Sequence, residues 1–233
     1  MNRGELRAAL REAGVYLVTE ESLSGGRRSE YIVEAALGAG VRAVQVREKD
    51  GSARRALEIA IAVRSLTRRY GALLVVDDRI DIALAAEADG IHLGQDDLPL
   101  TLARRLLGEA ALVGLSITDA GQLAGPDAAA ADCLGVGAVF RTDSKADARF
   151  TGLALLEAAR RASNAWFAAP VASAELGRTP VVAIGGINAG NAVLAARAGA
   201  DTVAVITAIT AAADPGRAAA ELLEAMRLGR GAE

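Results

Sequence analysis

The sequence predicts a single (β/α)8 TIM barrel of parallel strands that occupies residues 1–233 as one domain. Short apolar runs alternate with helical segments along the whole chain, which is the pattern of repeated βα units. Four junctions between a helix and the next strand place small residues before an apolar run: LGAGVRAVQV, AEADGIHLG, AAADCLGVG and ARAGADTVAVI. The chain has 233 residues, of which 52% are hydrophobic, so it is long enough and apolar enough for one such barrel.

Strands are expected where a run is apolar on both faces, as in a parallel strand that helices cover on the outside. Such runs occupy, in order, residues 15–19, 41–47, 72–76, 90–94, 112–116, 132–139, 180–184 and 202–206. They favour a closed barrel over an open doubly wound sheet, because the edge strands of an open sheet should be shorter or more polar. Gly135-x-Gly137 lacks a third glycine and a following helix, so we discard a dinucleotide-binding turn.

Helices are expected between these runs, where apolar residues recur with helical spacing. They occupy residues 29–37, 53–69, 80–87, 100–107, a weak segment near 120, 152–162 and 189–198. Asp214 and Pro215 provide an N-cap and a first-turn proline for a final helix that ends near Gly229. Residues 164–179 have little periodicity and predict a surface insertion, and residues 229–233 predict a frayed tail.

The composition limits the partners and the compartment that we expect. The formal net charge is −3, so no overall basic field indicates nucleic acid. No run reaches the roughly 18 apolar residues of a membrane span, and the first residues lack the apolar core of a signal peptide. The single cysteine, Cys133, excludes an internal disulfide and a thiolate metal cluster. We therefore expect a cytoplasmic protein with no nucleic-acid or membrane partner, and a homo-oligomer is left open.

Acidic side chains follow two successive predicted strands. Asp77 and Asp78 end the run at 72–76, and Asp96 and Asp97 follow the next strand after one short helix. If a right-handed crossover joins parallel neighbours, both acidic pairs emerge on the same side of the sheet. Like charges there need a cation between them, and Mg²⁺ suits one or two carboxylates together with phosphate oxygens and water. The alternative is a set of solvated turn aspartates.

Polar residues alternate with valines at the end of the second predicted strand. Gln45, Arg47 and Lys49 share one face and should approach the barrel mouth, where two cations and an amide suit a pyrophosphate. A solvated edge strand is the alternative, but a closed barrel has no edge. Lys145, in the polar loop after the sixth strand, would supply a third positive charge, although a basic loop is usually only solvated.

Three more positions suit an anion or the wall of a pocket. Ser116 ends the fifth strand, where its hydroxyl either donates to an anionic oxygen or only fills space. Residues 185–186 (Gly-Gly) and 206–207 (Ile-Thr) end the seventh and eighth strands, the usual phosphate positions of a barrel, although glycines also serve tight turns. His92 is the one histidine, so a core or pocket-wall imidazole fits better than a metal ligand.

Together these residues resemble the thiamine-phosphate synthase family. The match runs over nearly the whole chain, through QVREK, DDRIDIA, ADGIHLGQDDLP, GLS, GVGAVFRTDSK, VVAIGGI and GADTVAVITAI. The resemblance implies that the QxRxK set binds the diphosphate of an aminopyrimidine diphosphate and that Asp78 and Asp97 hold Mg²⁺. It implies further contacts with the diphosphate from Ser116 and Lys145, and with a thiazole phosphate from Thr142, Asp143, Ser144, Gly186, Ile206 and Thr207.

Several positions depart from the family pattern. Asp77 stands beside the pyrimidine diphosphate, where the family usually has Asn. An added carboxylate there is repulsive unless it turns outward, is protonated or touches the metal. Ile117 or Thr118 falls where a His often follows the serine, Ala138 replaces a common Pro, and Thr207 replaces a Ser.

The resemblance implies an alkyl transfer between two phosphorylated small molecules. The aminopyrimidine-methyl diphosphate would lose pyrophosphate, and the thiazole nitrogen would attack the methylene carbon without any protein nucleophile. Mg²⁺ would act with the candidate catalytic residues, which are Arg47, Lys49, Ser116 and Lys145. One alternative is a thiazole tautomerase of the same family, which should not need a diphosphate site. Another is a non-catalytic binder or sensor of phosphorylated thiamine precursors, for which Asp77 would be the damaging substitution.

Overall fold

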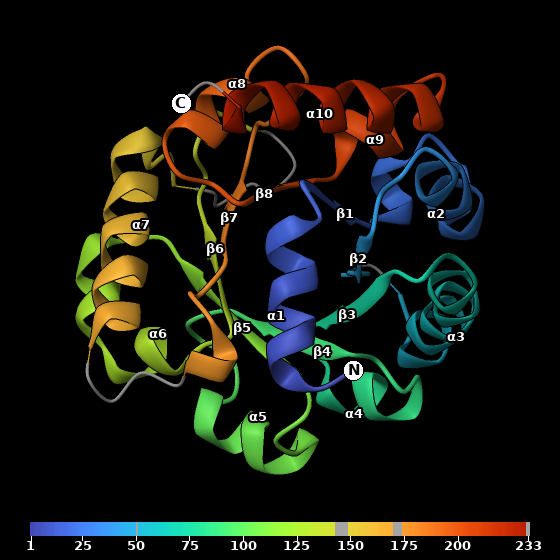
Figure 1. Cartoon of the computed structure of the whole chain (residues 1–233). Coiled ribbons are helices and arrows are strands. Elements are labelled where there is room, and N and C mark those ends of the chain that lie inside the picture. Colours follow the sequence, from blue (N-terminus) through green and yellow to red (C-terminus); the bar gives the residue numbers. More distant parts are fainter. Residues whose placement is uncertain (50, 143–148, 170–173, 232–233) are drawn as a thin grey trace.

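The strands form one closed parallel barrel, as the sequence predicts (Figure 1). The computed structural model describes residues 1–49, 51–142, 149–169 and 174–231. The strands pair in chain order, and the last pairs with the first, with Ala204 beside Tyr16. They are β1 (Val15–Val18), β2 (Ala43–Val46), β3 (Leu73–Asp77), β4 (Gly90–Leu93), β5 (Leu112–Ile117), β6 (Cys133–Val136), β7 (Val181–Ile184) and β8 (Thr202–Val205).

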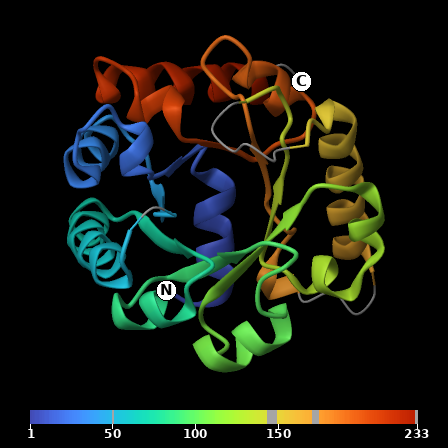
Figure 2. The ribbon, with the colours of Figure 1, turned by 180° about the vertical axis from the view of Figure 1, so that it is seen from behind.

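Helices surround the barrel on its outside (Figure 1, Figure 2). The α-helices are α1 (Arg3–Glu12), α2 (Ser29–Gly38), α3 (Ala53–Tyr70), α4 (Ile80–Ala85), α5 (Leu100–Leu107), α6 (Pro126–Ala130), α7 (Gly152–Ala168), α8 (Ala192–Arg197), α9 (Thr207–Thr210) and α10 (Pro215–Arg230). The 3-10 helices are η1 (Glu21–Leu23), η2 (Ala120–Ala124) and η3 (Ala174–Leu176). In the described part of the chain, no helix has the length and apolarity to cross a membrane.

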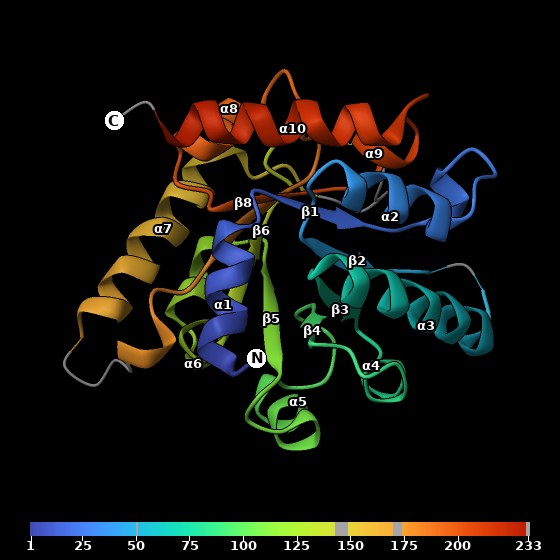
Figure 3. The same cartoon turned by 45° about the vertical axis from the view of Figure 1, so that its right-hand side comes forward.

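Helix α1 covers the end of the barrel at which the strands begin. It lies at the centre of the ring of helices in Figure 1 and in front of the strands in Figure 3. Asn2 and Glu5 start it with a capping box, in which each side chain accepts a hydrogen bond from the other residue's backbone N–H. Leu6 and Leu10 are buried against the barrel interior, and the Thr202 hydroxyl donates to the Leu10 carbonyl at 2.7 Å. This apolar plug closes one end, so a ligand must enter from the other.

Side chains along each strand alternate between two apolar regions. One region fills the barrel and contacts α1, and its strand residues include Ala43, Leu73, Val75, Leu112 and Val182. The other packs between strands and helices, and includes Val44, Leu74, Val76, Val113 and Ala183. Because successive side chains point to opposite faces, this alternation decides which polar residues near the strand ends face inward.

Aspartates precede β4, β6 and β8 within the repeated junctions, where Asp132 and Asp201 are buried and Asp89 is half-buried. Each carboxylate accepts a 2.8 Å hydrogen bond from a backbone N–H near the start of the preceding strand. Each also pairs with an arginine of the helix that leads into that preceding strand. The three pairs are Asp89 with Arg64, Asp132 with Arg104, and Asp201 with Arg160. At each of these three junctions, the aspartate therefore links the start of its own strand and the start of the preceding strand to one helix.

Two expectations about where helices end were wrong. Residues 164–168 do not begin a surface insertion, because they continue α7: Trp166 packs against the core and the Ser163 hydroxyl donates to the Thr179 carbonyl at 2.7 Å. Residues 229–230 are not frayed, because α10 continues to Arg230. Gly229 is buried there, and a Cβ on it would lie 2.5 Å from the Ala196 Cβ.

We predict that Asp132→Ala strongly destabilises the fold. Asp132 is fully buried and accepts from Arg3 Nε at 2.6 Å as well as from Arg104, so its loss leaves charged groups unpaired. The free energy of unfolding should fall by about 3 kcal/mol or more, measured by urea denaturation. The matched control is Glu157→Ala, whose carboxylate is 53% exposed and should cost less than about 0.5 kcal/mol. Equal effects in both variants would contradict the proposed role of the repeat.

Candidate active site

Three of the predicted site residues, together with the candidate pocket-wall residue His92, belong to the inward-facing set at the carboxyl ends of β2 to β5. They are Gln45, Asp77, His92 and Ser116. Gln45, Asp77 and Ser116 each lie an even number of positions along their strand from a residue of the barrel interior. His92 lies two positions from Gly90, which pairs with the interior residues Val75 and Leu112. Parallel pairing places Asp77 beside His92 and His92 beside Gly114. The fold therefore gathers residues from separate parts of the sequence around one mouth.

The QxRxK residues divide between the barrel interior and the loop above it. Gln45 is buried, and its Nε2 donates a 3.1 Å hydrogen bond to the Tyr16 hydroxyl. Strand β2 ends at Val46, so Arg47 and Lys49 lie beyond the strand end rather than on it. The Gln45 amide thus lines the interior, whereas the side chains of Arg47 and Lys49 reach the ends of neighbouring strands.

Arg47 is held by two carboxylates. Its guanidinium pairs with Glu20, which follows β1 and is only 4% exposed, and its Nε lies 3.7 Å from Asp77 Oδ2. Its backbone N–H donates to the Thr19 hydroxyl oxygen at 3.2 Å. Glu20 was not among the predicted site residues, although it carries the same signal as Asp77, a carboxylate at the end of an apolar strand.

Lys49 bridges the two carboxylates at the end of β3. Its Nζ lies 3.0 Å from Asp77 Oδ2 and also pairs with Asp78. Burial disfavours the ammonium, but the contacts with Asp78 and Asp77 outweigh burial and raise the pKa of Lys49 above its usual value. Asp77, the departure from the family pattern, is therefore neutralised by cations instead of turning outward.

Asp78 and Asp97 approach each other from the ends of β3 and β4. Asp78 has a left-handed backbone with φ of 56°, and its N–H donates to the His92 carbonyl at 2.9 Å. Asp97 Oδ2 accepts a hydrogen bond from the Gly94 N–H at 2.6 Å. Burial raises the pKa of Asp97, and a hydrogen bond with Asp78 raises it further. The turn and the backbone contact thus keep two acidic groups close together.

This donor set fits a hard divalent cation. A cation between Asp78 and Asp97 would balance the charge of two acidic groups that lie close together. Within residues 1–49, 51–142, 149–169 and 174–231, no three acidic, histidine or cysteine side chains form a metal-binding group. Mg²⁺ suits such a site, because it needs only one or two carboxylates when phosphate oxygens and water supply the rest.

His92 and Gln95 hold Ser116 from two sides. His92 Nε2 lies 3.0 Å from Ser116 Oγ, and Gln95 Nε2 donates to the Ser116 carbonyl at 2.6 Å. Gly114 and Gly135 make room for the imidazole, since a Cβ on them would lie 2.5 Å from Nδ1 and 2.7 Å from Cε1 respectively. His92 is therefore part of the pocket wall, and it fixes the direction of the Ser116 hydroxyl.

The loops after β6 and β7 are joined edge to edge. Val139 and Phe140 donate backbone hydrogen bonds of 2.9 and 3.0 Å to the carbonyls of Ile184 and Gly185. Gly186 has φ of 65°, and a Cβ on it would lie 2.3 Å from the Arg141 carbonyl oxygen. This close approach requires glycine and places the double-glycine loop next to the segment that leads into Thr142.

The remaining predicted phosphate residues follow β8 or lie in the loop after β6. Ile206 N-caps α9, and its carbonyl accepts the first hydrogen bonds of that short helix at 2.8 and 3.0 Å. Thr207 is the first residue of the helix, so it lies on the strand end next to that of Gly186. Three predicted site residues lie outside the described residues, and their roles stay predictions: Asp143, Ser144 and Lys145.

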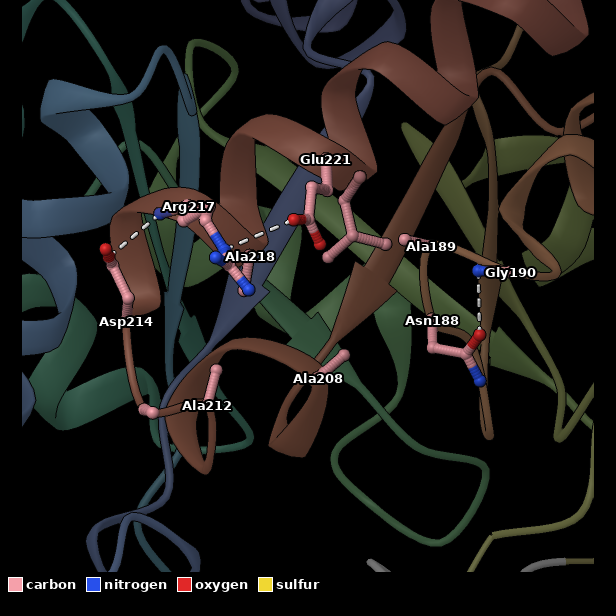
Figure 4. A pocket seen from close by; sticks show the side chains of 11 residues that line it. Asn188, Ala189, Gly190, Ala208, Ala212, Asp214, Arg217, Ala218 and Glu221 are labelled. Carbon is pink, nitrogen blue, oxygen red and sulfur yellow. Dashed lines mark hydrogen bonds and ion pairs between the residues drawn. The ribbon is translucent and has the colours of Figure 1, made fainter.

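A groove of about 480 Å³ lies near these loops, between the loop after β7 and the start of α10 (Figure 4). Its lining includes several alanines and Asn188, and the Arg217 Nε lies 3.3 Å from a Glu221 oxygen on the same helix. None of its 11 lining residues is a predicted site residue. The charged part of the candidate site therefore lies outside this groove, at the ends of β1 to β5, where opposite charges converge.

We predict that His92 is neutral in the folded protein at pH 7. Burial lowers the pKa of His92 below 6.5, and the nearby carboxylates of Asp77, Asp78 and Asp97 only partly oppose this. The unfolded chain then binds a proton that the folded chain does not, so stability is present above pH 6.5 and falls as the pH drops below it. An NMR titration of the one imidazole should give a pKa below 6.5, and a value above 6.5 would contradict the assigned environment.

Relatives of this chain share its length as well as its sequence. The family model described as thiamine monophosphate synthase matches residues 15–209. The thiamine-phosphate synthase of Haloarcula marismortui is 46% identical over 216 residues, which cover 93% of this chain and 98% of the relative. That of Moorella thermoacetica is 43% identical over 218 residues, which cover 93% of this chain and 97% of the relative.

Solved structures agree with these sequence matches. The thiamine phosphate pyrophosphorylase from Pyrococcus furiosus superposes with a TM-score of 0.80 and 34% identity, covering 95% of this chain and all (100%) of that one. The orotidine 5'-phosphate decarboxylase from Pyrococcus horikoshii shares the fold alone, with a TM-score of 0.61, 15% identity and coverage of 91% and 99%. Because the family model spans most of the barrel and the relatives match over nearly their whole length, the chain belongs to the thiamine monophosphate synthase family.

Proposed function

We propose that this chain joins 4-amino-2-methyl-5-(diphosphooxymethyl)pyrimidine to a thiazole phosphate, giving thiamine phosphate and pyrophosphate. One observation carries the proposal: Arg47 and Lys49 pair with the acidic end of β3, where Asp78 lies close to Asp97 from the loop after β4. Cations beside a donor set for a divalent metal suit a diphosphate leaving group. Membership of the family supports the same activity.

The pyrimidine diphosphate is proposed to bind at the mouth of β2 to β5. Arg47 and Lys49 would donate N–H hydrogen bonds to phosphate oxygens and stabilise the charge that develops as the C–O bond to pyrophosphate breaks. The Ser116 hydroxyl, held 3.0 Å from His92 Nε2, would donate to the same group. The other proposed contacts are Gln45 and, from the family pattern, Lys145, while Asp77 lies beside the diphosphate through its ion pairs with Lys49 and Arg47. The thiazole nitrogen then forms the new C–N bond, so no protein nucleophile is needed.

Asp78 and Asp97 are the proposed ligands of Mg²⁺. When bound there, Mg²⁺ would act as a Lewis acid that neutralises charge on the diphosphate. The contribution of the chain is to hold the two carboxylates together. The Gly94 N–H anchors Asp97 at 2.6 Å, and the left-handed turn after β3 directs Asp78 toward it.

The thiazole phosphate is proposed to bind at the loops after β6, β7 and β8. Backbone N–H groups in glycine loops and at helix starts suit a phosphate dianion, and barrels use these strand ends for that purpose. Two anion sites on one rim would hold both reactants within reach, which makes their reaction effectively intramolecular. The proposed contacts are Thr142, Asp143, Ser144, Gly186, Ile206 and Thr207.

We also propose that the protein acts in the cytoplasm on small phosphorylated substrates. A single cysteine, Cys133, which is buried in the structure, agrees with a reducing compartment. A homo-oligomer stays a prediction, and sedimentation of the purified protein would decide it.

The direct test of the proposed function is product formation. Pure protein incubated with both substrates and Mg²⁺ should release thiamine phosphate and pyrophosphate in equal amounts, and Lys49→Ala should be much slower because one phosphate-binding charge is lost. Chromatography measures the first product, and a coupled phosphate assay measures the second. Binding of both substrates without any product would support the non-catalytic binder instead.

We predict that Asp97→Asn loses metal-dependent activity. Because metal stabilisation contributes several kcal/mol, kcat should fall by a factor of about 100 or more. The matched control is Asp96→Asn, because Asp96 lies exposed in the same turn and its substitution removes the same charge. A steady-state assay across Mg²⁺ concentrations measures both variants. Full turnover of Asp97→Asn in a chelator would contradict the assignment.

A further inference from the structure

The mouth of the barrel holds more acidic than basic groups among the described residues of β1 to β4 and their loops. Two cations, Arg47 and Lys49, lie among four carboxylates: Glu20, Asp77, Asp78 and Asp97. A diphosphate that binds there brings further negative charge. Each cation must therefore change partners, and the residue that holds both cations controls how easily they do so.

Asp77 contacts both cations through one oxygen. Its Oδ2 lies 3.0 Å from Lys49 Nζ and 3.7 Å from Arg47 Nε. The Asp77 side chain is 14% exposed and the Arg47 side chain 17%, so water screens this pair less than a surface ion pair. Asp77 also lies beside His92 in the strand register, which leaves its carboxylate directed toward the mouth.

We propose that Asp77 competes with the diphosphate for Lys49 and Arg47 and so weakens the hold of the site on pyrophosphate. This inference rests on the proposed function, because it takes the diphosphate to bind at these two cations. An arriving diphosphate replaces the Asp77 oxygen at both cations, and the displaced carboxylate stays nearby and repels it. Asp77 therefore lowers the affinity for the pyrophosphate product and favours its release.

The substitution Asp77→Asn separates charge from shape. Asparagine keeps the size of the side chain and an acceptor oxygen but removes the negative charge. Isothermal titration calorimetry with pyrophosphate should show binding about tenfold tighter for Asp77→Asn than for the unchanged protein, both with Mg²⁺ and in a chelator. The matched control is Asp81→Asn. Asp81 lies on α4, and its exposed carboxylate pairs with Arg79, the residue before that helix. The affinity of this variant for pyrophosphate should equal that of the unchanged protein.

Each other outcome has a separate meaning. Equal affinity of Asp77→Asn and Asp81→Asn would overturn the competition. If Asp77→Asn binds pyrophosphate more weakly only when Mg²⁺ is present, Asp77 is a metal ligand, and the proposed competition is again overturned. If the unchanged protein fails to bind pyrophosphate with Mg²⁺, the proposed function fails instead. Circular dichroism checks that the variants fold, and Asp77→Ser, which also removes the charge, should bind pyrophosphate more tightly by the same reasoning.

Discussion

Ion pairs hold Arg47 and Lys49 against the acids that follow β1 and β3, and the chemistry of the site depends on these contacts. They exist because parallel pairing brings the ends of neighbouring strands to one rim, where side chains from distant segments meet. In the proposed function, the cations that would bind the diphosphate are therefore positioned in advance, but on carboxylates of the chain itself. Binding would then exchange one set of anions for another, which would explain how Asp77 can lie in such a site.

At the opposite end of the barrel, the contacts hold the fold together. There α1 plugs the interior, and the aspartates before β4, β6 and β8 clamp strand starts to helices through arginines. These carboxylates are also ion-paired and at least half-buried, yet they accept hydrogen bonds from backbone N–H groups at the strand starts. The same chemical pair, aspartate with arginine, thus has a structural use at one end and, in the proposed function, a ligand-binding use at the other. Position along the strand separates the two.

The repeated junctions and apolar runs were enough to predict the barrel, because each βα unit carries its own local pattern. Contacts between distant segments were not predictable in this way. The apolar face of helix α1 packs into the barrel interior, and residues 164–168 continue α7, where Trp166 packs against the core. At the site, strand-end position identified Asp77, Asp78, Asp97 and the QxRxK set. It did not identify Glu20, which lies 27 residues from its partner Arg47 in the sequence.

In the proposed function, the cations of the mouth pass from the carboxylates of the chain to a diphosphate. A crystal structure of the protein with Mg²⁺ and pyrophosphate tests this exchange directly. Lys49 Nζ and the Arg47 guanidinium should then contact phosphate oxygens, with Lys49 no longer on Asp77, where it now lies 3.0 Å from Oδ2. Pyrophosphate bound elsewhere, with Lys49 and Arg47 on their present partners, would contradict the exchange.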